Sequence, residues 1–181
     1  IFSYACKCCY IENNPVTLID LTGIEPTKKK KTITRQELEA IIEALKNRTC
    51  KDSFKNDSME IALYIGYYSG LRLSEALALE KNDFDFINNE IHVNKQLDCI
   101  GKHINEIETT TKLKTNSSNA TIPLAEPLKE KLVDWFKINP YSRVICDVEG
   151  NYINDCFFAT TLKGIAKKTG IYFHFHMLRH T

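Results

Sequence analysis

Apolar residues recur at helical spacing in the first third of the chain. Thr34 marks the clearest helix start, because Glu37 follows it at the distance of a capping box and Ile33 precedes it as half of a hydrophobic staple. The apolar positions that follow are spaced three and four residues apart, which predicts an amphipathic helix docked on a core. These positions are Leu38, Ile41, Ile42 and Leu45.

Further helices are expected on both sides of this one. Residues 1–12 read as the end of a helix that Pro15 breaks. Residues 58–68 are apolar on nearly every face, which predicts a buried central helix that Gly70 ends in a left-handed turn. Three more helices are expected at residues 72–80, 127–139 and 157–168.

From residue 90 the apolar period changes to two. A strand is therefore predicted from Glu90 through Leu97, after a turn at residues 88–89. Residues 107–112 and 120–124 predict a second and a third strand, and residues 144–146 a short one. Together these elements predict an α+β fold that is mainly helical, with a small three-stranded antiparallel sheet at one edge.

Composition narrows the class of protein. Lys and Arg number 24 against 23 Asp and Glu, and the resulting net charge of +1 neither requires nor excludes nucleic acid. No apolar run approaches the roughly 18 residues of a membrane span, and the first residues do not resemble a signal peptide. The seven cysteines are scattered through the chain. A cytoplasmic protein with reduced thiols and no membrane partner is therefore expected.

Basic residues cluster at residues 28–35 and again from residue 156 to 181, where no acidic residue accompanies them. The run Lys28, Lys29, Lys30 and Lys31 is a candidate for contacts to DNA, with a solvated linker as the alternative.

Arginine suits phosphate because its planar fork makes bidentate, permanently charged hydrogen bonds. Arg72 and Arg179 are candidates for this role, and Glu75, three residues after Arg72, could hold its guanidinium in place. For each arginine alone, a surface or capping position is the alternative.

Histidines gather near the end of the chain. His176 and His180 are four residues apart and share a face if this stretch is helical, whereas His174 is expected in the core. The same spacing would suit zinc, and a second candidate metal set is Cys6, Cys8 and Cys9. Against zinc, the histidines have neither an accompanying CxxC pair nor the glutamate of an HExxH motif. A zinc-binding domain therefore remains an alternative, and no metal is assigned.

Three patches of sequence resemble one known family. SGLRLSEALAL surrounds Arg72, the turn KTNSS at residues 114–118 precedes Ile122–Pro123, and HMLRH occupies residues 176–180. Taken together they resemble the signature boxes of tyrosine recombinases, the phage integrase family, in that family's order. The resemblance covers most of the chain and implies an integrase-type catalytic domain. A type IB topoisomerase shares the chemistry, but the spacing is more similar to an integrase.

The resemblance implies a division of roles. Arg72, Arg179 and His180 would stabilise charge on a scissile DNA phosphate, with Glu75 supporting Arg72. His176 would assist deprotonation of the attacking tyrosine. Lys114, preferred over Lys112, would protonate the leaving oxygen from its hairpin position. The residues implied to contact DNA are Lys28, Lys29, Lys30, Lys31, Lys112 and Thr115.

The implied reaction is site-specific recombination or integration through a 3′-phosphotyrosine, for a phage or conjugative element. The implied partners are double-stranded DNA recombination sites and a homo-oligomer, a tetramer, assembled on them. No cofactor is expected, because the covalent link conserves the energy of the phosphodiester bond. A recombinase-like module that binds DNA without cutting it is the main alternative.

Two features depart from the family pattern. The eight tyrosines all precede the HMLRH box, whereas the family places its nucleophile after it, so no nucleophile is assigned in this chain. The expectation is a C-terminally incomplete catalytic domain at residues 25–181, preceded at residues 1–24 by the end of a core-binding-domain helix and a linker. Asn119 and Ala120 stand where many relatives have a basic residue, which puts one backbone contact to DNA in doubt.

Overall fold

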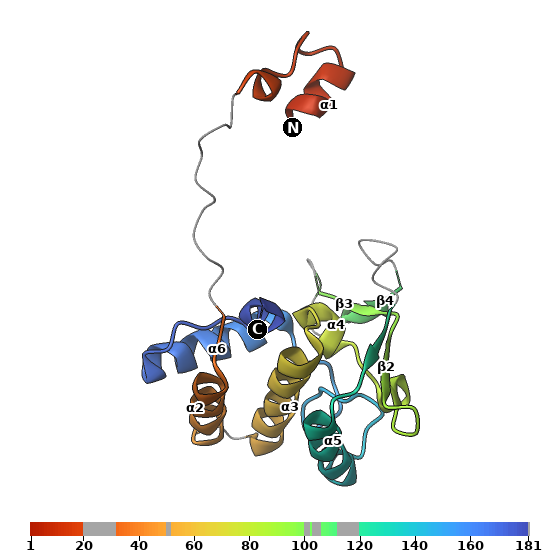
Figure 1. Ribbon diagram of the computed structural model, residues 1–181, viewed down its shortest axis with the longest axis vertical. Coiled ribbons are helices and arrows are strands. Elements are labelled where there is room, and N and C mark those ends of the chain that lie inside the picture. The colour runs from red at the N-terminus through yellow and green to blue at the C-terminus, as the bar shows by residue number, and fades with distance from the viewer. Residues whose placement is uncertain (20–31, 50–51, 100–101, 103–105, 112–119, 181) are drawn as a thin grey trace.

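The computed structural model describes residues 1–19, 32–49, 52–99, 102, 106–111 and 120–180. Helices dominate this part of the chain, as the spacing of apolar residues predicts (Figure 1). The α-helices are α1 (Phe2–Lys7), α2 (Arg35–Lys46), α3 (Ser53–Ser69), α4 (Leu73–Leu77), α5 (Glu126–Ile138) and α6 (Asp155–Thr169). Shorter 3₁₀ helices are η1 (Pro15–Leu18), η2 (Lys81–Asp83) and η5 (Phe175–His180). In the described ranges, no helix has both the length and the apolar character to cross a membrane.

The strands form two antiparallel ladders. β1 (Phe84–Asp85), β2 (Glu90–Val93) and β5 (Ala120–Pro123) make a three-stranded sheet in the order β1-β2-β5. β3 (Gln96–Asp98) pairs only with β4 (Glu108–Thr110) within the described residues. The α+β class and the small three-stranded sheet are confirmed, although the membership of that sheet differs from the prediction.

The predicted strand from Glu90 to Leu97 is divided in two. Val93 and Leu97 are both buried, so the expected apolar face persists. Between them Lys95 forms ion pairs with Glu80 and Asp83, at 2.9 Å and 3.0 Å. The strand predicted at residues 107–112 pairs with the second half, β3, instead of joining β2, and the two-residue β1 takes its place in the sheet.

Two other predicted elements are wrong in extent. The helix expected at residues 72–80 ends at Leu77, because Leu79 and Lys81 form backbone hydrogen bonds with Val144 and Ser142 instead. Residues 144–146, expected to form a strand, do not pair with another strand in a ladder. In its place, the chain makes isolated bridges between Glu80 and Arg143 and between Cys146 and Tyr152.

The start of α2 follows its sequence signals closely. The Thr34 hydroxyl accepts a hydrogen bond from the Glu37 backbone N–H at 3.2 Å, and a Glu37 carboxylate oxygen accepts from the Thr34 N–H at 2.8 Å. Ile33 and Leu38 are both buried beside this capping box. The predicted helix start is therefore confirmed.

Replacing Thr34 by alanine is expected to lower the free energy of unfolding by about 1 kcal/mol, because a backbone N–H at the start of α2 loses its acceptor. Chemical denaturation measures this change. Thr160→Ala, at an exposed position of α6, is the control and should change the free energy by less than about 0.5 kcal/mol. Equal losses in the two variants would contradict the capping role.

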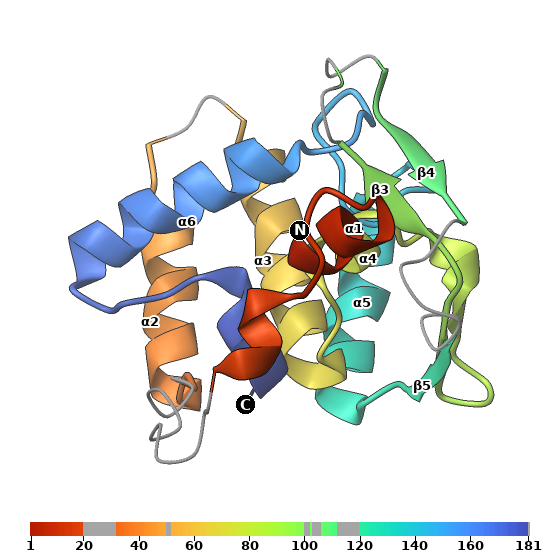
Figure 2. The same cartoon turned by 90° about the horizontal axis from the view of Figure 1, so that it is seen from above.

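Helix α3 is the centre of the fold. Both views place it between α2 and α5 (Figure 2), and η5 also packs against it. Met59, Leu63 and Ile65 are fully buried. Gly70 ends the helix in the left-handed region, with φ 64° and ψ 20°, as predicted. The C-terminal end of α3 therefore has a fixed exit towards α4.

Helix α6 leads into the last described segment. Asn154 caps its first turn by accepting a hydrogen bond from the Cys156 N–H at 2.7 Å, and Gly170 ends it with φ 70°. Phe158 is fully buried and meets Phe175 edge to face, with ring centroids 5.7 Å apart. This contact joins α6 to η5, which carries the HMLRH residues.

The N-terminal residues form α1 and η1, which contain no buried residue. Figure 1 draws them apart from the remaining elements. The predicted helix at residues 1–12 is confirmed in type but ends at Lys7, and Cys9 has a positive φ of 57°. The boundary expected at residue 24 lies outside the described residues, so the division of the chain stays a prediction.

Candidate active site

Arg72 and Glu75 form a tight pair at the start of α4. Arg72 is the N-cap residue, and its backbone N–H donates to Glu75 Oε2 at 2.8 Å. The Arg72 Nη1 also donates to Glu75 Oε1 at 2.7 Å. The Glu75 side chain is only 5% exposed, whereas that of Arg72 is 42% exposed. One buried carboxylate therefore holds both the backbone and the guanidinium of Arg72 while leaving the guanidinium open to solvent.

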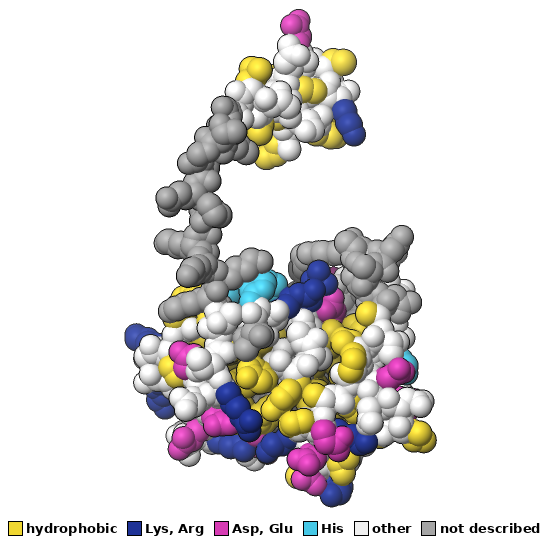
Figure 3. All heavy atoms as spheres, in the orientation of Figure 1, with side chains coloured by type: hydrophobic (Ala, Val, Ile, Leu, Met, Phe, Trp, Pro, Cys, Tyr) yellow, Lys and Arg dark blue, Asp and Glu magenta, His cyan; other side chains and the backbone are white. Residues whose placement is uncertain are grey.

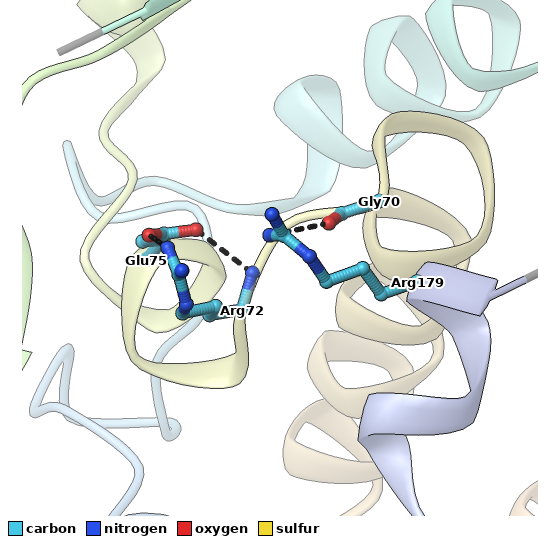
Figure 4. Close-up of polar contacts among 4 residues, drawn as sticks. All are labelled: Gly70, Arg72, Glu75 and Arg179. Atoms are coloured by element: carbon cyan, nitrogen blue, oxygen red, sulfur yellow. Dashed lines mark hydrogen bonds and ion pairs between the residues drawn. The ribbon is translucent and has the colours of Figure 1, made fainter. Parts of the chain in front are cut away.

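Arg179 reaches the same region from the other end of the chain. It lies on η5, where the preceding residues Met177 and Leu178 are buried and anchor the short helix. Its Nη1 donates to the backbone carbonyl oxygen of Gly70 at 3.1 Å. Figure 4 shows this guanidinium directed at the turn between α3 and α4. Arg72 lies at the end of the same turn, where α4 begins.

The two arginines line one cavity. Its volume is about 160 Å³, and its wall combines the α3–α4 turn, α4, the β2–β5 face and η5. The lining residues are Ser69, Gly70, Leu71, Arg72, Glu75, Val93, Ala120, Ile122 and Arg179. Two positive charges and one negative charge give this cavity a net positive charge, which suits an anion.

The histidines of the HMLRH box lie beside each other. His176 and His180 meet edge to face, with ring centroids 4.8 Å apart. Their segment is a 3₁₀ helix rather than the α-helix that a spacing of four would suit, yet the rings still approach. Figure 3 shows histidine surface next to Lys and Arg surface on one face of the molecule.

His174 is not in the core, so that prediction is wrong. Its side chain is exposed and meets the Tyr172 ring edge to face at 5.8 Å. The buried positions alternate with it, because Phe173 and Phe175 point inward on either side. An extended stretch before η5 therefore places His174 on the solvent side.

Several predicted site residues lie outside the described residues. They are Lys28, Lys29, Lys30, Lys31, Lys112, Lys114 and Thr115. Ala120, the first residue of β5, lines the cavity, and Lys114 precedes it by six positions in the sequence. The described part of the chain thus contains Arg72, Glu75, His176, Arg179 and His180 from the predicted set.

The zinc alternative gains no cluster of ligands. Across the described ranges, no group of three His, Cys, Asp or Glu side chains is placed to hold a metal ion. His176 and His180 are paired with each other, while His174 faces Tyr172.

Sequence reasoning missed the role of the backbone at the site. Gly70 is predicted only as the end of a helix, but its carbonyl also binds Arg179. Gly66 is likewise missed: a Cβ built there would lie 2.6 Å from the Phe175 ring and 2.8 Å from Leu178. A glycine inside an otherwise apolar helix is the signal that could have indicated such a close approach.

Comparisons with known proteins identify the family and the fold. The model of the phage integrase family matches residues 31–181. Transposase A from transposon Tn554 of Staphylococcus aureus (strain N315) is 28% identical over 167 residues, which covers 85% of this chain and 40% of the transposase. The chain thus spans less than half the length of this relative.

Solved structures show the same fold. The Tn1549 transposon integrase in complex with circular intermediate DNA has a TM-score of 0.71 at 19% identity, covering 99% of this chain and 60% of that one. A lambda integrase tetramer bound to a Holliday junction has a TM-score of 0.64 at 16% identity, covering 99% of this chain and 48% of that one. The predicted integrase-type fold is confirmed, and with the match over residues 31–181 this chain belongs to the phage integrase family, the tyrosine recombinases.

Proposed function

We propose that this chain is the catalytic part of a tyrosine recombinase that cleaves and rejoins double-stranded DNA at specific sites, for a phage or conjugative element. Residues 25–181 would be the catalytic domain, and residues 1–24 the end of a core-binding helix and its linker. The observation that carries the proposal is that Arg72 and Arg179 line the same cavity, with the buried Glu75 bound to Arg72.

The cavity would receive the scissile phosphate. Glu75 holds one nitrogen of the Arg72 guanidinium, so the group is already directed before charge grows on the non-bridging oxygens of the phosphate. Arg179 adds a second cation from η5. His180, beside His176, would donate a further hydrogen bond to the phosphate. Fixed donors of this kind lower the energy of the pentacoordinate transition state more than that of the bound substrate.

Proton transfer would accompany the attack. A tyrosine oxygen would bond to phosphorus while His176 assists removal of its proton, because a neutral imidazole can accept one near neutral pH. The bond to the 5′ oxygen would break, and Lys114 would supply the proton that makes this oxygen a hydroxyl. The resulting 3′-phosphotyrosine keeps the energy of the broken bond, so rejoining requires no ATP and no cofactor.

The proposed partners are DNA and further copies of the chain. Lys28, Lys29, Lys30, Lys31, Lys112 and Thr115 would contact the DNA backbone around the site. A tetramer on DNA is proposed because a similar fold belongs to a lambda integrase tetramer bound to a Holliday junction. The place of action would be the cytoplasm.

A non-cutting DNA-binding module is the second candidate. It would be favoured if the intact protein carried no tyrosine C-terminal to the HMLRH box, since the eight tyrosines of these 181 residues all precede it. None of them is assigned as the nucleophile. Both candidates require the cavity to bind a DNA phosphate, so this shared step is tested first.

Arg72→Ala and Arg179→Ala are each expected to weaken binding of a 30-base-pair duplex about five- to tenfold, since each removes one charged contact to phosphate. Fluorescence anisotropy over a series of salt concentrations measures the affinity. The slope of log affinity against log salt should fall by about 1 in each variant.

Lys137→Ala is the matched control for charge. Lys137 is 69% exposed in the last turn of α5, where it pairs with Asp134. Trp135, two residues before Lys137, contacts Phe54 in the first turn of α3. Gly70 and the cavity are at the other end of α3. The affinity of the Lys137→Ala variant for the duplex should stay within about twofold of that of the unchanged protein. Affinities of the two arginine variants that match this control would refute a phosphate site at the cavity.

A further inference from the structure

Gly70 lies between the two arginines of the candidate active site. It is the C-cap of α3, with φ 64° and ψ 20°. Its carbonyl oxygen accepts the hydrogen bond from Arg179, and two residues later the chain reaches Arg72 at the start of α4 (Figure 4). The turn that binds the Arg179 guanidinium therefore also leads directly to Arg72, although the two arginines are 107 positions apart.

We infer that Gly70 is a positioning residue: its left-handed backbone directs the carbonyl that orients Arg179 beside Arg72. A guanidinium has five N–H donors, so one bond to Gly70 leaves the others available for an anion in the cavity. Without that bond, the exposed Arg179 side chain would occupy many rotamers. The purpose of this orientation rests on the proposed function, but the orientation itself can be measured without DNA.

The requirement for glycine at this position is conformational rather than steric. A Cβ built on Gly70 meets no atom within 4 Å, so a side chain would fit. Only the positive φ opposes a substitution. Asparagine enters the left-handed region more readily than other residues with a side chain, alanine does so less, and a β-branched residue least. A residue that abandons this φ would turn the carbonyl of position 70 away from Arg179.

Gly170 provides a matched control. It is the C-cap of α6 with φ 70° and ψ 3°, and a Cβ built there also meets no atom within 4 Å. Within the described part of the chain, its carbonyl has no hydrogen bond to an arginine. Gly170→Val therefore imposes the same backbone strain at a helix end away from the cavity.

The first test follows the side-chain NMR resonance of Arg179 in the free protein, assigned by its loss in Arg179→Lys. In Gly70→Val this resonance is expected to move to the position of an unrestrained arginine. In Gly70→Asn and Gly170→Val it should stay in place. A resonance unchanged in Gly70→Val, or changed equally in Gly170→Val, would overturn the inference. If Gly70→Val does not fold, Gly70→Ala takes its place and should give a smaller shift in the same direction.

The second test is a double-mutant cycle on affinity for the 30-base-pair duplex. Gly70→Val should weaken binding about fivefold in the unchanged background and less than about twofold in the Arg179→Ala background, because a residue that acts through Arg179 has no effect once Arg179 is absent. Additive losses would overturn the inference. If Arg179→Ala alone leaves the affinity unchanged, the phosphate site proposed for Arg179 fails, whereas the NMR test still decides whether Gly70 positions it.

Discussion

Replacement of Arg72 by alanine is expected to reduce covalent DNA adducts by about a thousandfold or more, in a protein that carries these 181 residues together with a nucleophilic tyrosine. The physical reason is that the buried Glu75 restricts Arg72 at two points, through one hydrogen bond from its guanidinium and one from its backbone N–H. Its donors need no rearrangement as charge develops on the phosphate. Adducts on a nicked duplex, separated by denaturing electrophoresis, measure this loss.

The control for this experiment addresses folding. Arg72→Ala leaves the Glu75 carboxylate buried with the backbone N–H of position 72 as its remaining contact from that residue. Some stability is therefore lost, and thermal unfolding should confirm that the variant remains folded at the assay temperature. Lys137→Ala removes an exposed charge elsewhere and should keep full adduct formation. Adducts that persist in folded Arg72→Ala would refute the catalytic role of Arg72.

Gly66→Ala is expected to lower the free energy of unfolding by about 1–3 kcal/mol, although alanine normally favours a helix over glycine by up to about 1 kcal/mol. The added methyl group would lie 2.6 Å from the Phe175 ring and 2.8 Å from Leu178. Leu178 has a flexible end, but Phe175 is held against the buried Phe158. Helix η5 must therefore move away from α3, and Arg179 with it.

Gly164→Ala is the matched control for Gly66→Ala. Gly164 also lies inside a helix, α6, but a Cβ built there meets no atom within 4 Å. This variant should be more stable than the unchanged protein by about 0.5–1 kcal/mol. Chemical denaturation of both variants measures the difference in sign. In addition, Gly66→Ala should weaken DNA binding; a stabilised Gly66→Ala with full affinity would contradict the close packing of η5 on α3.

The elements that the sequence predicts well are those fixed by neighbouring residues. Thr34 and Glu37 are three positions apart, and their reciprocal hydrogen bonds depend on little else. Gly70 ends α3 because its own φ is positive. The pairing of Arg72 with Glu75 is equally local. In each case the residues that decide the structure lie within one turn of each other, so a linear pattern contains the necessary information.

The errors arise where distant residues decide the structure. Helix α4 ends early because Leu79 and Lys81 bond to residues 142–144, which no local pattern indicates. Likewise, the predicted long strand divides where Lys95 pairs with Glu80 and Asp83. At the site, the bond from Arg179 to the Gly70 carbonyl has no sequence signature, because a backbone acceptor is present at every position.

The two halves of the cavity differ in how far apart their partners lie along the chain. Arg72 and Glu75 are separated by three positions, whereas Arg179 and Gly70 are separated by 109. A contact of short range can form together with its own helix turn, but one that closes a long loop must await docking of the intervening elements. The proposed anion site is therefore expected to assemble in two stages during folding. Arg72 can be oriented once α4 forms, whereas the second cation arrives only when η5 has docked on α3, so the proposed binding of phosphate would report the completion of the fold.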